Sequence, residues 1–406
     1  MNYFELYHFL KGKANFHERE IKIDNLLNWY NQPFCSDSHN ILGGLEKYNC
    51  QTHQIDFDSY THNESTLTHT NPTLDVDDAH LKENNEFNYH IFKPANAEKA
   101  KEVILLFHGF NEKYWFKYLP WAYSLQKKTG KTIILFPIAF HMNRAPHDWS
   151  DMKKMYEVSM NRKKEFPDII NCSMSNVAIS SRLHAKPQRF FWSGLQTYND
   201  IMQLIAQIRK GEHQLIDSTA TFDIFSYSIG SLLAQILMMT NQNNEFEKSK
   251  SYMFCGGAVF NRMSPVSKFI IDSEASVAMY SHIIEHIDSH LAHNKRLQHY
   301  LKQHPEGIYF FSMLDYRKLK VHRENRLREI ASRMKGLTLE KDSIIPSYEI
   351  ISTLRGADHS IPISVDVFDF PYPYKHEEPF PATEKNAQLI DEQFTRFIDH
   401  ASEFLA

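Results

Sequence analysis

The spacing of apolar residues changes near residue 86, where regular elements begin. The run Glu86–Pro94 alternates apolar and polar positions, which predicts a half-buried strand. Val103–Phe107 and Thr132–Phe136 are continuous apolar runs, typical of strands that helices cover on both faces. The segment Trp115–Lys127 between them predicts a connecting helix. These two continuous strands and the helix between them form a predicted βαβ unit.

A second unit of the same kind follows. Apolar residues recur at helical spacing over Leu195–Ile208, and Ala220–Phe225 predicts another short strand. Ile229–Met239 is apolar nearly all round, as in a helix buried against a sheet. Further strands are predicted at Tyr252–Phe260 and Ile308–Met313. This alternation predicts an α/β fold with a mostly parallel central sheet flanked by helices.

The chain is expected to hold one large α/β domain with added segments. We assign residues 81–406 to this domain and residues 1–80 to an N-terminal extension or arm, because Asn49–Asn71 is polar and shows no regular period. The stretches at about 141–191 and 261–306 are too long for simple connections and are expected to be helical insertions.

The composition argues against a nucleic-acid partner and against a membrane-spanning segment. The 45 basic and 49 acidic residues are spread along the chain without a Lys/Arg block, so no nucleic-acid partner is expected. The longest apolar stretch, Thr132–Phe140, is too short to span a bilayer. Residues 1–10 show no secretion signal. A cytoplasmic location without a membrane span is therefore the expectation.

Metal and cofactor motifs are scarce. The four cysteines are widely separated, which argues against a zinc site or a disulfide scaffold. No phosphate-binding glycine loop or dinucleotide fingerprint occurs. Four histidines share one predicted helix stripe beside an apolar one, which is more typical of a solvent boundary than of a metal site: His282, His286, His290 and His293. His53 lies in polar sequence and is expected to face water. No metal and no cofactor are predicted.

The strongest chemical signal is Ser226-Tyr227-Ser228-Ile229-Gly230, between a predicted strand and a predicted helix. A small-x-Ser-x-Gly pattern there is typical of a nucleophile elbow, whose sharp turn tolerates only small residues two positions from the nucleophile. Ser226 stands where the first glycine usually is. Ser228 is the predicted nucleophile, and the backbone N–H of Ile229 is predicted to face a developing oxyanion.

A second motif, His108-Gly109-Phe110, ends the predicted strand Val103–Phe107. With the elbow one βαβ unit later, the sequence resembles the α/β-hydrolase superfamily, and is similar to a bacterial branch of it without an assigned activity. The resemblance covers the chain from about residue 86 onward. It implies that the N–H of Phe110 completes the oxyanion hole with that of Ile229.

The resemblance also implies the chain order nucleophile, acid, base, and two pairs fit that order. Asp342, which precedes Ile345-Pro346, can pair with His376. Asp315, after the predicted strand Ile308–Met313, can instead pair with His359. We favour Asp342 with His376, because this pair leaves no predicted element without a role. A remoter acid candidate is Asp272.

The expected function is a serine hydrolase that cleaves an ester or related acyl bond of a small molecule through an acyl-enzyme. His108, Asn143 and Arg144 are the predicted substrate contacts, although a buried loop tied by side-chain hydrogen bonds explains Arg144 equally well. Two alternatives remain open. One is a non-catalytic binding or scaffold protein of the same fold, and the other is an acyltransferase or peptidase using the same residues.

Overall fold

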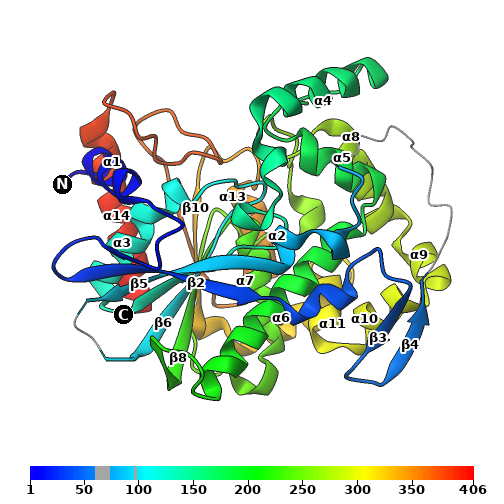
Figure 1. Cartoon of the computed structure of the whole chain (residues 1–406), viewed down its shortest axis with the longest axis horizontal. Helices are drawn as coiled ribbons and strands as arrows, with labels where there is room; N and C mark the ends of the chain where they lie inside the picture. Colours follow the sequence, from blue (N-terminus) through cyan, green and yellow to red (C-terminus); the bar gives the residue numbers. More distant parts are fainter. Residues whose placement is uncertain (60–73, 96–97) are drawn as a thin grey trace.

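A twisted sheet of nine strands crosses the molecule in the computed structural model, which describes residues 1–59, 74–95 and 98–406 (Figure 1). Its strands are β1 Glu20–Lys22, β2 Leu27–Cys35, β5 Glu86–Pro94, β6 Ala100–Phe107, β7 Thr132–Leu135, β8 Ile216–Tyr227, β9 Ser251–Phe254, β10 Met334–Leu339 and β11 Ser364–Phe368. The spatial order is β1-β2-β5-β7-β6-β8-β9-β10-β11. From β7 to β11 all neighbours run parallel, whereas the β1, β2 and β5 pairings are antiparallel.

Helices cover both faces of this sheet, which confirms the predicted fold class. On one face lie α1 Tyr3–Lys13, α3 Tyr118–Thr129 and α14 Ala387–Leu405. On the other face lie α6 Arg189–Arg209, α7 Gly230–Thr240 and α13 Ser347–Leu354. The side chains of Val103–Phe107 are at most 1% exposed, because each one enters one of the two helix-covered cores. Every position in this run is apolar because both faces of the strand are buried.

Strands β6 and β8 end at the same level. Their parallel register pairs Phe107 with Ser226, so the loops that follow both strands meet at the carboxyl edge of the sheet. Parallel α/β sheets build their sites at that edge. The His108-Gly109 and Ser228 motifs are therefore neighbours in space.

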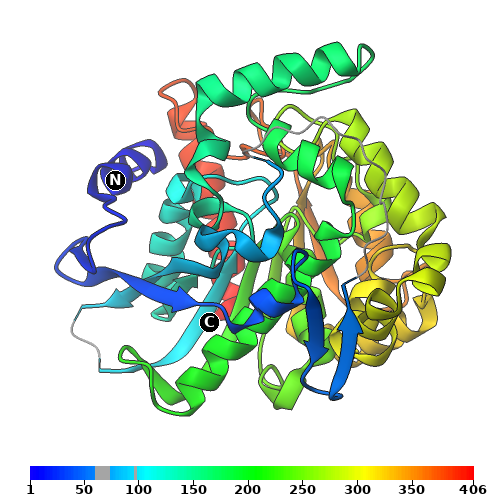
Figure 2. The same ribbon diagram turned by 45° about the vertical axis from the view of Figure 1, so that its right-hand side comes forward.

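Two helical insertions cover that edge (Figures 1 and 2). The first holds α4 Met152–Glu165 and α5 Val177–Ala185; the second holds α8 Ser273–Tyr280, α9 Ile287–His293, α10 Lys295–Gln303, α11 Pro305–Ser312 and α12 Lys320–Glu329. They are joined by Arg162, whose Nε and Nη2 donate to the Asp272 carboxylate at 2.7 and 2.9 Å. Both side chains of this bidentate ion pair are buried.

The N-terminal segment is built into the fold rather than forming a separate arm. Strand β2 pairs with β5 at nine positions, and its alternating burial matches a strand with one face on the core. A hairpin of β3 Lys47–Cys50 and β4 Ile55–Asp58 follows and lies beside α10. Residues 60–73, which include the end of the polar stretch Asn49–Asn71, lie outside the described residues.

Two sequence predictions of secondary structure are wrong. The predicted strand Ile308–Met313 is instead the end of helix α11, which runs from Pro305 to Ser312, with Met313 as its C-cap. A short apolar run cannot by itself distinguish a strand from a buried helix. The predicted strand Tyr252–Phe260 stops at Phe254, because Cys255 and Gly257 adopt positive φ values of 47° and 120°. Within the described ranges, no helix has the length and apolarity that a membrane crossing requires.

Candidate active site

Ser228 lies on a sharp turn between β8 and α7 and has a φ of +55°. This left-handed conformation is unfavourable for a non-glycine residue and is held by close packing around the turn. A Cβ on Gly230 would lie 2.8 Å from the His108 carbonyl oxygen, and one on Gly256 would clash with the Ser228 carbonyl oxygen. Both glycines are therefore needed for the turn to form.

Ser226 fits this turn although a glycine is usual there. Its buried hydroxyl lies 3.1 Å from Ser231 Oγ and donates to the Tyr252 carbonyl at 3.3 Å. The side chain is small and its oxygen is paired, so the position carries no uncompensated polar group. The departure from the usual glycine does not disrupt the elbow.

A chain of hydrogen bonds links Ser228 to an imidazole and a carboxylate. Ser228 Oγ lies 2.7 Å from His376 Nε2, and His376 Nδ1 lies 2.7 Å from Asp342 Oδ2. The second carboxylate oxygen, Oδ1, accepts from the backbone N–H groups of Ile344 and Ile345 at 2.9 and 3.0 Å. The three linked residues are each 4% exposed. This geometry suits proton transfer from the serine hydroxyl to the imidazole.

Tyr227, beside the nucleophile, holds the backbone of His376. Its hydroxyl donates to the His376 carbonyl, and the two rings stack with centroids 5.5 Å apart. Burial raises the pKa of Tyr227, so the phenol stays protonated and able to donate. Lys117 adds a second clamp, since its Nζ donates to the Glu377 carbonyl at 2.9 Å. Sequence alone does not reveal Tyr227 as a positioning residue, because its partner His376 is remote in the chain.

The predicted oxyanion loop is fixed by His108. His108 Nδ1 donates to the Gly109 carbonyl at 2.7 Å, and Nε2 accepts from the Ile138 N–H at 2.9 Å. A trans peptide points its C=O and N–H in opposite directions, so this bond turns the Phe110 N–H away from His108. Within the described residues, neither this N–H nor that of Ile229 has a hydrogen-bond acceptor. Both remain free for a substrate oxygen.

His108 itself does not reach the substrate, which corrects its predicted role as a substrate contact. The ring is fully buried, and both nitrogens are used within the protein. Burial also lowers the pKa of His108, so the imidazole stays neutral and keeps one donor and one acceptor nitrogen. His108 is a positioning residue for the loop.

Asn111, next to this loop, ties both insertions to the sheet edge. Its side-chain amide donates to the Ser175 carbonyl of the first insertion at 3.0 Å and to the Phe269 carbonyl of the second at 2.6 Å. Asn111 has a φ of 56°, which asparagine tolerates better than most residues. The sequence gives no signal for this role, because a single Asn has no motif and its two partners are remote in the chain.

Arg144 is a structural residue, which contradicts its predicted contact with substrate. Its Nη2 donates to Asp200 Oδ2 at 2.7 Å, while Nε and Nη1 donate to the carbonyls of Asn84 and Pro137. Neither side chain of the Arg144–Asp200 pair is exposed to solvent. The other interpretation, a buried loop tied by side-chain hydrogen bonds, is correct. Asn143 is exposed, donates to the Asn88 carbonyl and lines neither pocket described below.

Replacing Arg144 with methionine is expected to lower the free energy of unfolding by about 3–5 kcal/mol, because Asp200 would remain buried without its charge partner. Urea unfolding followed by circular dichroism measures this loss. The matched control is Asn143→Ala at the neighbouring exposed position, for which we expect a change within about 1 kcal/mol. An Arg144→Met protein that unfolds at the urea concentration of the parent would contradict a stabilising ion pair.

Within the described part of the chain, the alternative acid and base candidates do not form hydrogen bonds with Ser228 or with each other. His359 is exposed on the turn after α13, and Asp315 follows helix α11 and caps the N–H of Arg317 at 2.7 Å. Asp272 caps α8 through the N–H of Ala275 and pairs with Arg162. The structure brings Asp342 and His376, and not these residues, to Ser228.

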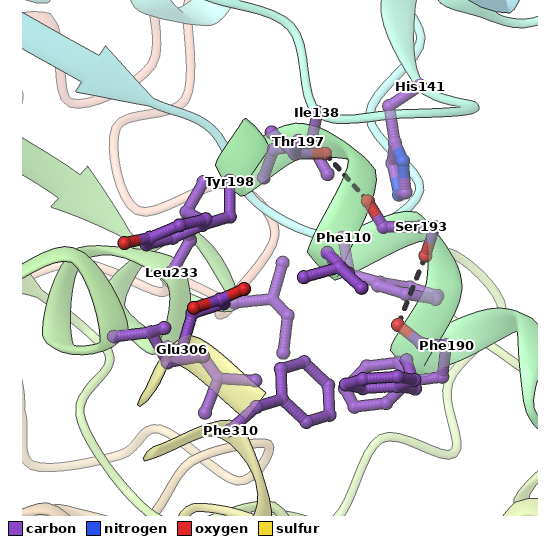
Figure 3. A pocket seen from close by; sticks show the side chains of 16 residues that line it. Phe110, Ile138, His141, Phe190, Ser193, Thr197, Tyr198, Leu233, Glu306 and Phe310 are labelled. Carbon is purple, nitrogen blue, oxygen red and sulfur yellow. Dashed lines mark hydrogen bonds between the residues drawn. The ribbon is translucent and has the colours of Figure 1, made fainter. Parts of the chain in front are cut away.

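Two small apolar cavities flank the free N–H groups. One, of about 50 Å³, extends away from Ser228, and the other, of about 30 Å³, reaches Ser228 itself. Phe110, Phe190 and Ile229 line both. In the larger cavity, shown in Figure 3, Phe310 and Leu233 line the wall together with Phe110, and the carboxylate of Glu306 lies near Tyr198. The cavities are small, so a substrate larger than a few atoms requires side chains of the insertions to move.

A family model described as a family of unknown function (DUF6051) matches residues 1–406 of the chain. No curated protein matches it. Among solved structures, carboxyl esterase 2 of Tuber melanosporum is 11% identical, with a TM-score of 0.38 over 77% of this chain and 81% of the esterase. A thermostable esterase of Pseudomonas putida is 8% identical, with a TM-score of 0.41 over 79% and 80%.

A third similar structure is the acylaminoacyl peptidase of Pyrococcus horikoshii, which is 12% identical with a TM-score of 0.38 over 77% of this chain and 38% of the peptidase. Similarities this distant carry no argument about the reaction.

Proposed function

The chain belongs to this family of unknown function, and from the geometry of its site we propose that it is a serine hydrolase that cleaves an ester or related acyl bond of a small molecule. The observation that carries the proposal is the buried chain of two 2.7 Å hydrogen bonds from Ser228 through His376 to Asp342. A nucleophile, a base and an orienting acid in this order are what acyl transfer needs.

In the first step, Ser228 Oγ attacks the acyl carbon while His376 Nε2 takes the hydroxyl proton. The N–H groups of Phe110 and Ile229 donate to the oxygen that becomes negative, and one such donor contributes roughly 3 kcal/mol. The tetrahedral intermediate then expels the leaving group, which takes the proton from His376. An acyl group on Ser228 remains.

In the second step, water attacks the acyl-enzyme and gives a proton to His376. The second tetrahedral intermediate releases the acid and restores the Ser228 hydroxyl. Asp342 accepts from His376 Nδ1 throughout, which selects the tautomer with a free lone pair at Nε2 and stabilises the imidazolium.

The cavities support a substrate with a short apolar acyl group. They lie on either side of Phe110, Phe190 and Ile229, so one can take the acyl chain while the other takes the leaving group. Water and other acceptors compete for the acyl-enzyme through pocket shape, so product analysis separates hydrolysis from acyl transfer. The hydrogen-bonded acid and base count against a non-catalytic scaffold, which has no need for either group.

Incubating the folded protein with a fluorophosphonate probe tests the proposal. We expect covalent modification of Ser228, mapped by mass spectrometry of peptides, because an activated serine attacks the phosphorus as it would an acyl carbon. The Ser228→Ala protein and heat-denatured parent are the controls, and neither is expected to react. Folded parent protein that stays unlabelled at Ser228 would sink the proposal.

A further inference from the structure

Four potential metal ligands gather outside the proposed active site. Cys50 ends strand β3, and His53 lies in the turn between β3 and β4. His299 lies in α10, and His304 lies between α10 and α11. One ligand atom from each of these residues lies within 4.8 Å of those of the others. The N-terminal hairpin and the second insertion therefore meet at this cluster.

Four of the six distances between the ligand atoms are close to those of a tetrahedral metal site, and all six are within 4.8 Å. Cys50 Sγ lies 3.5 Å from His53 Nδ1 and 3.3 Å from His304 Nε2. His304 Nε2 lies 3.2 Å from both His53 Nδ1 and His299 Nε2. Zinc bonds of about 2.1 Å to nitrogen and 2.3 Å to sulfur at tetrahedral angles separate ligand atoms by about 3.3–3.6 Å.

Hydrogen bonds alone do not explain why these four ligand atoms lie so close together. His304 Nδ1 lies 3.1 Å from Glu306 Oε1 and donates its proton there, so a neutral His304 carries only a lone pair at Nε2. Three neighbouring ligand atoms surround that single lone pair. The three imidazole rings are nearly perpendicular to one another, at 79–87°, so their nitrogens meet edge to edge instead of stacking. A cation at the centre would use one lone pair from each group.

We propose that Cys50, His53, His299 and His304 bind one Zn²⁺ ion in a Cys-His₃ site. One thiolate and three imidazoles form a soft nitrogen and sulfur set that suits Zn²⁺ and is unsuitable for Mg²⁺ or Ca²⁺. Glu306 orients His304 through the ring nitrogen that does not face the ion, as carboxylates commonly do at zinc sites. Cys50, His299 and His304 are buried while His53 is exposed, which leaves an entry side for the ion.

The ion is structural, because four protein ligands complete a tetrahedral shell. It fastens the β3–β4 hairpin to the insertion, where Arg296 already stacks on Tyr48 at 3.5 Å and Trp192 at 4.0 Å. Glu306 also lines the larger apolar cavity, so the site fixes one wall of that cavity. Removal of the ion is therefore expected to loosen the hairpin and this wall together.

Metal analysis of the untagged full-length protein, followed by chelation and cobalt titration, tests the proposal. We expect one zinc per chain by inductively coupled plasma mass spectrometry. After chelation, Co²⁺ should bind at one equivalent and give visible tetrahedral bands with a thiolate-to-cobalt charge-transfer band. Absence of the charge-transfer band in protein that keeps its circular dichroism spectrum would overturn the proposal.

Single-residue variants test which side chains bind the metal ion. Cys50→Ser should abolish the charge-transfer band, whereas Cys35→Ser, which removes an exposed cysteine on β2, should leave it unchanged. His53→Ala removes the exposed ligand with the least disturbance of the core and should weaken Co²⁺ binding at least about 100-fold. If Cys50→Ser does not fold, His53→Ala decides the outcome. Parent-like cobalt affinity in His53→Ala would count against the site.

Discussion

Replacing His376 with alanine is expected to lower kcat by roughly 10⁵- to 10⁶-fold on any ester that the parent cleaves. The imidazole lies 2.7 Å from Ser228 Oγ and is the only side-chain partner of this hydroxyl among the residues that the structure describes, so the hydroxyl would lose its proton acceptor. KM should change little, because the ring is 4% exposed and offers little surface for binding substrate. Steady-state kinetics on short-chain nitrophenyl esters measure the effect.

The matched control is His359→Ala, which removes the base of the alternative pair. His359 is exposed on the turn after α13, so we expect parental kcat and parental stability. Circular dichroism and urea unfolding establish that the His376→Ala protein is folded. If His359→Ala were inactive while His376→Ala kept activity, the alternative base would be the correct one.

Replacing Asp342 with asparagine is expected to lower kcat by about 10⁴-fold. The asparagine oxygen can still accept from the N–H groups of Ile344 and Ile345, but its amide group then faces His376. An amide donor beside Nδ1 favours the tautomer with the proton on Nε2, which cannot accept the proton of Ser228. The fold should persist, because the two side chains have nearly the same shape.

Asp315→Asn is the control for this prediction, since Asp315 is the acid of the alternative pair and caps a backbone N–H after α11. We expect less than a twofold change in kcat for this variant. Fluorophosphonate labelling rates give a second readout that does not depend on the substrate. A labelling rate for Asp342→Asn equal to that of the parent would show that Asp342 does not orient the base.

The local features of the fold were predictable from the sequence. Continuous apolar runs such as Val103–Phe107 indicate strands buried on both faces, and the small residues around Ser228 indicate a turn too tight for larger ones. These patterns arise from backbone geometry and burial within a few residues. The fold class could be predicted because these local patterns are visible in the sequence. Ile308–Met313 is the exception, because a short, mostly apolar run suits a strand and a buried helix alike.

Which distant residues meet was decided by the tertiary structure alone. Arg144 suits a substrate or a buried partner, and only the packing of α6 against the loop after β7 places Asp200 within 2.7 Å. The sequence left two acid and base pairs open, and only the structure brings one of them to Ser228. The spacing of the cysteines gave no sign of a metal site, because Cys50 and His304 are 254 residues apart. Hydrophobic patterns encode burial, whereas the partners of buried polar groups depend on the topology that joins remote segments.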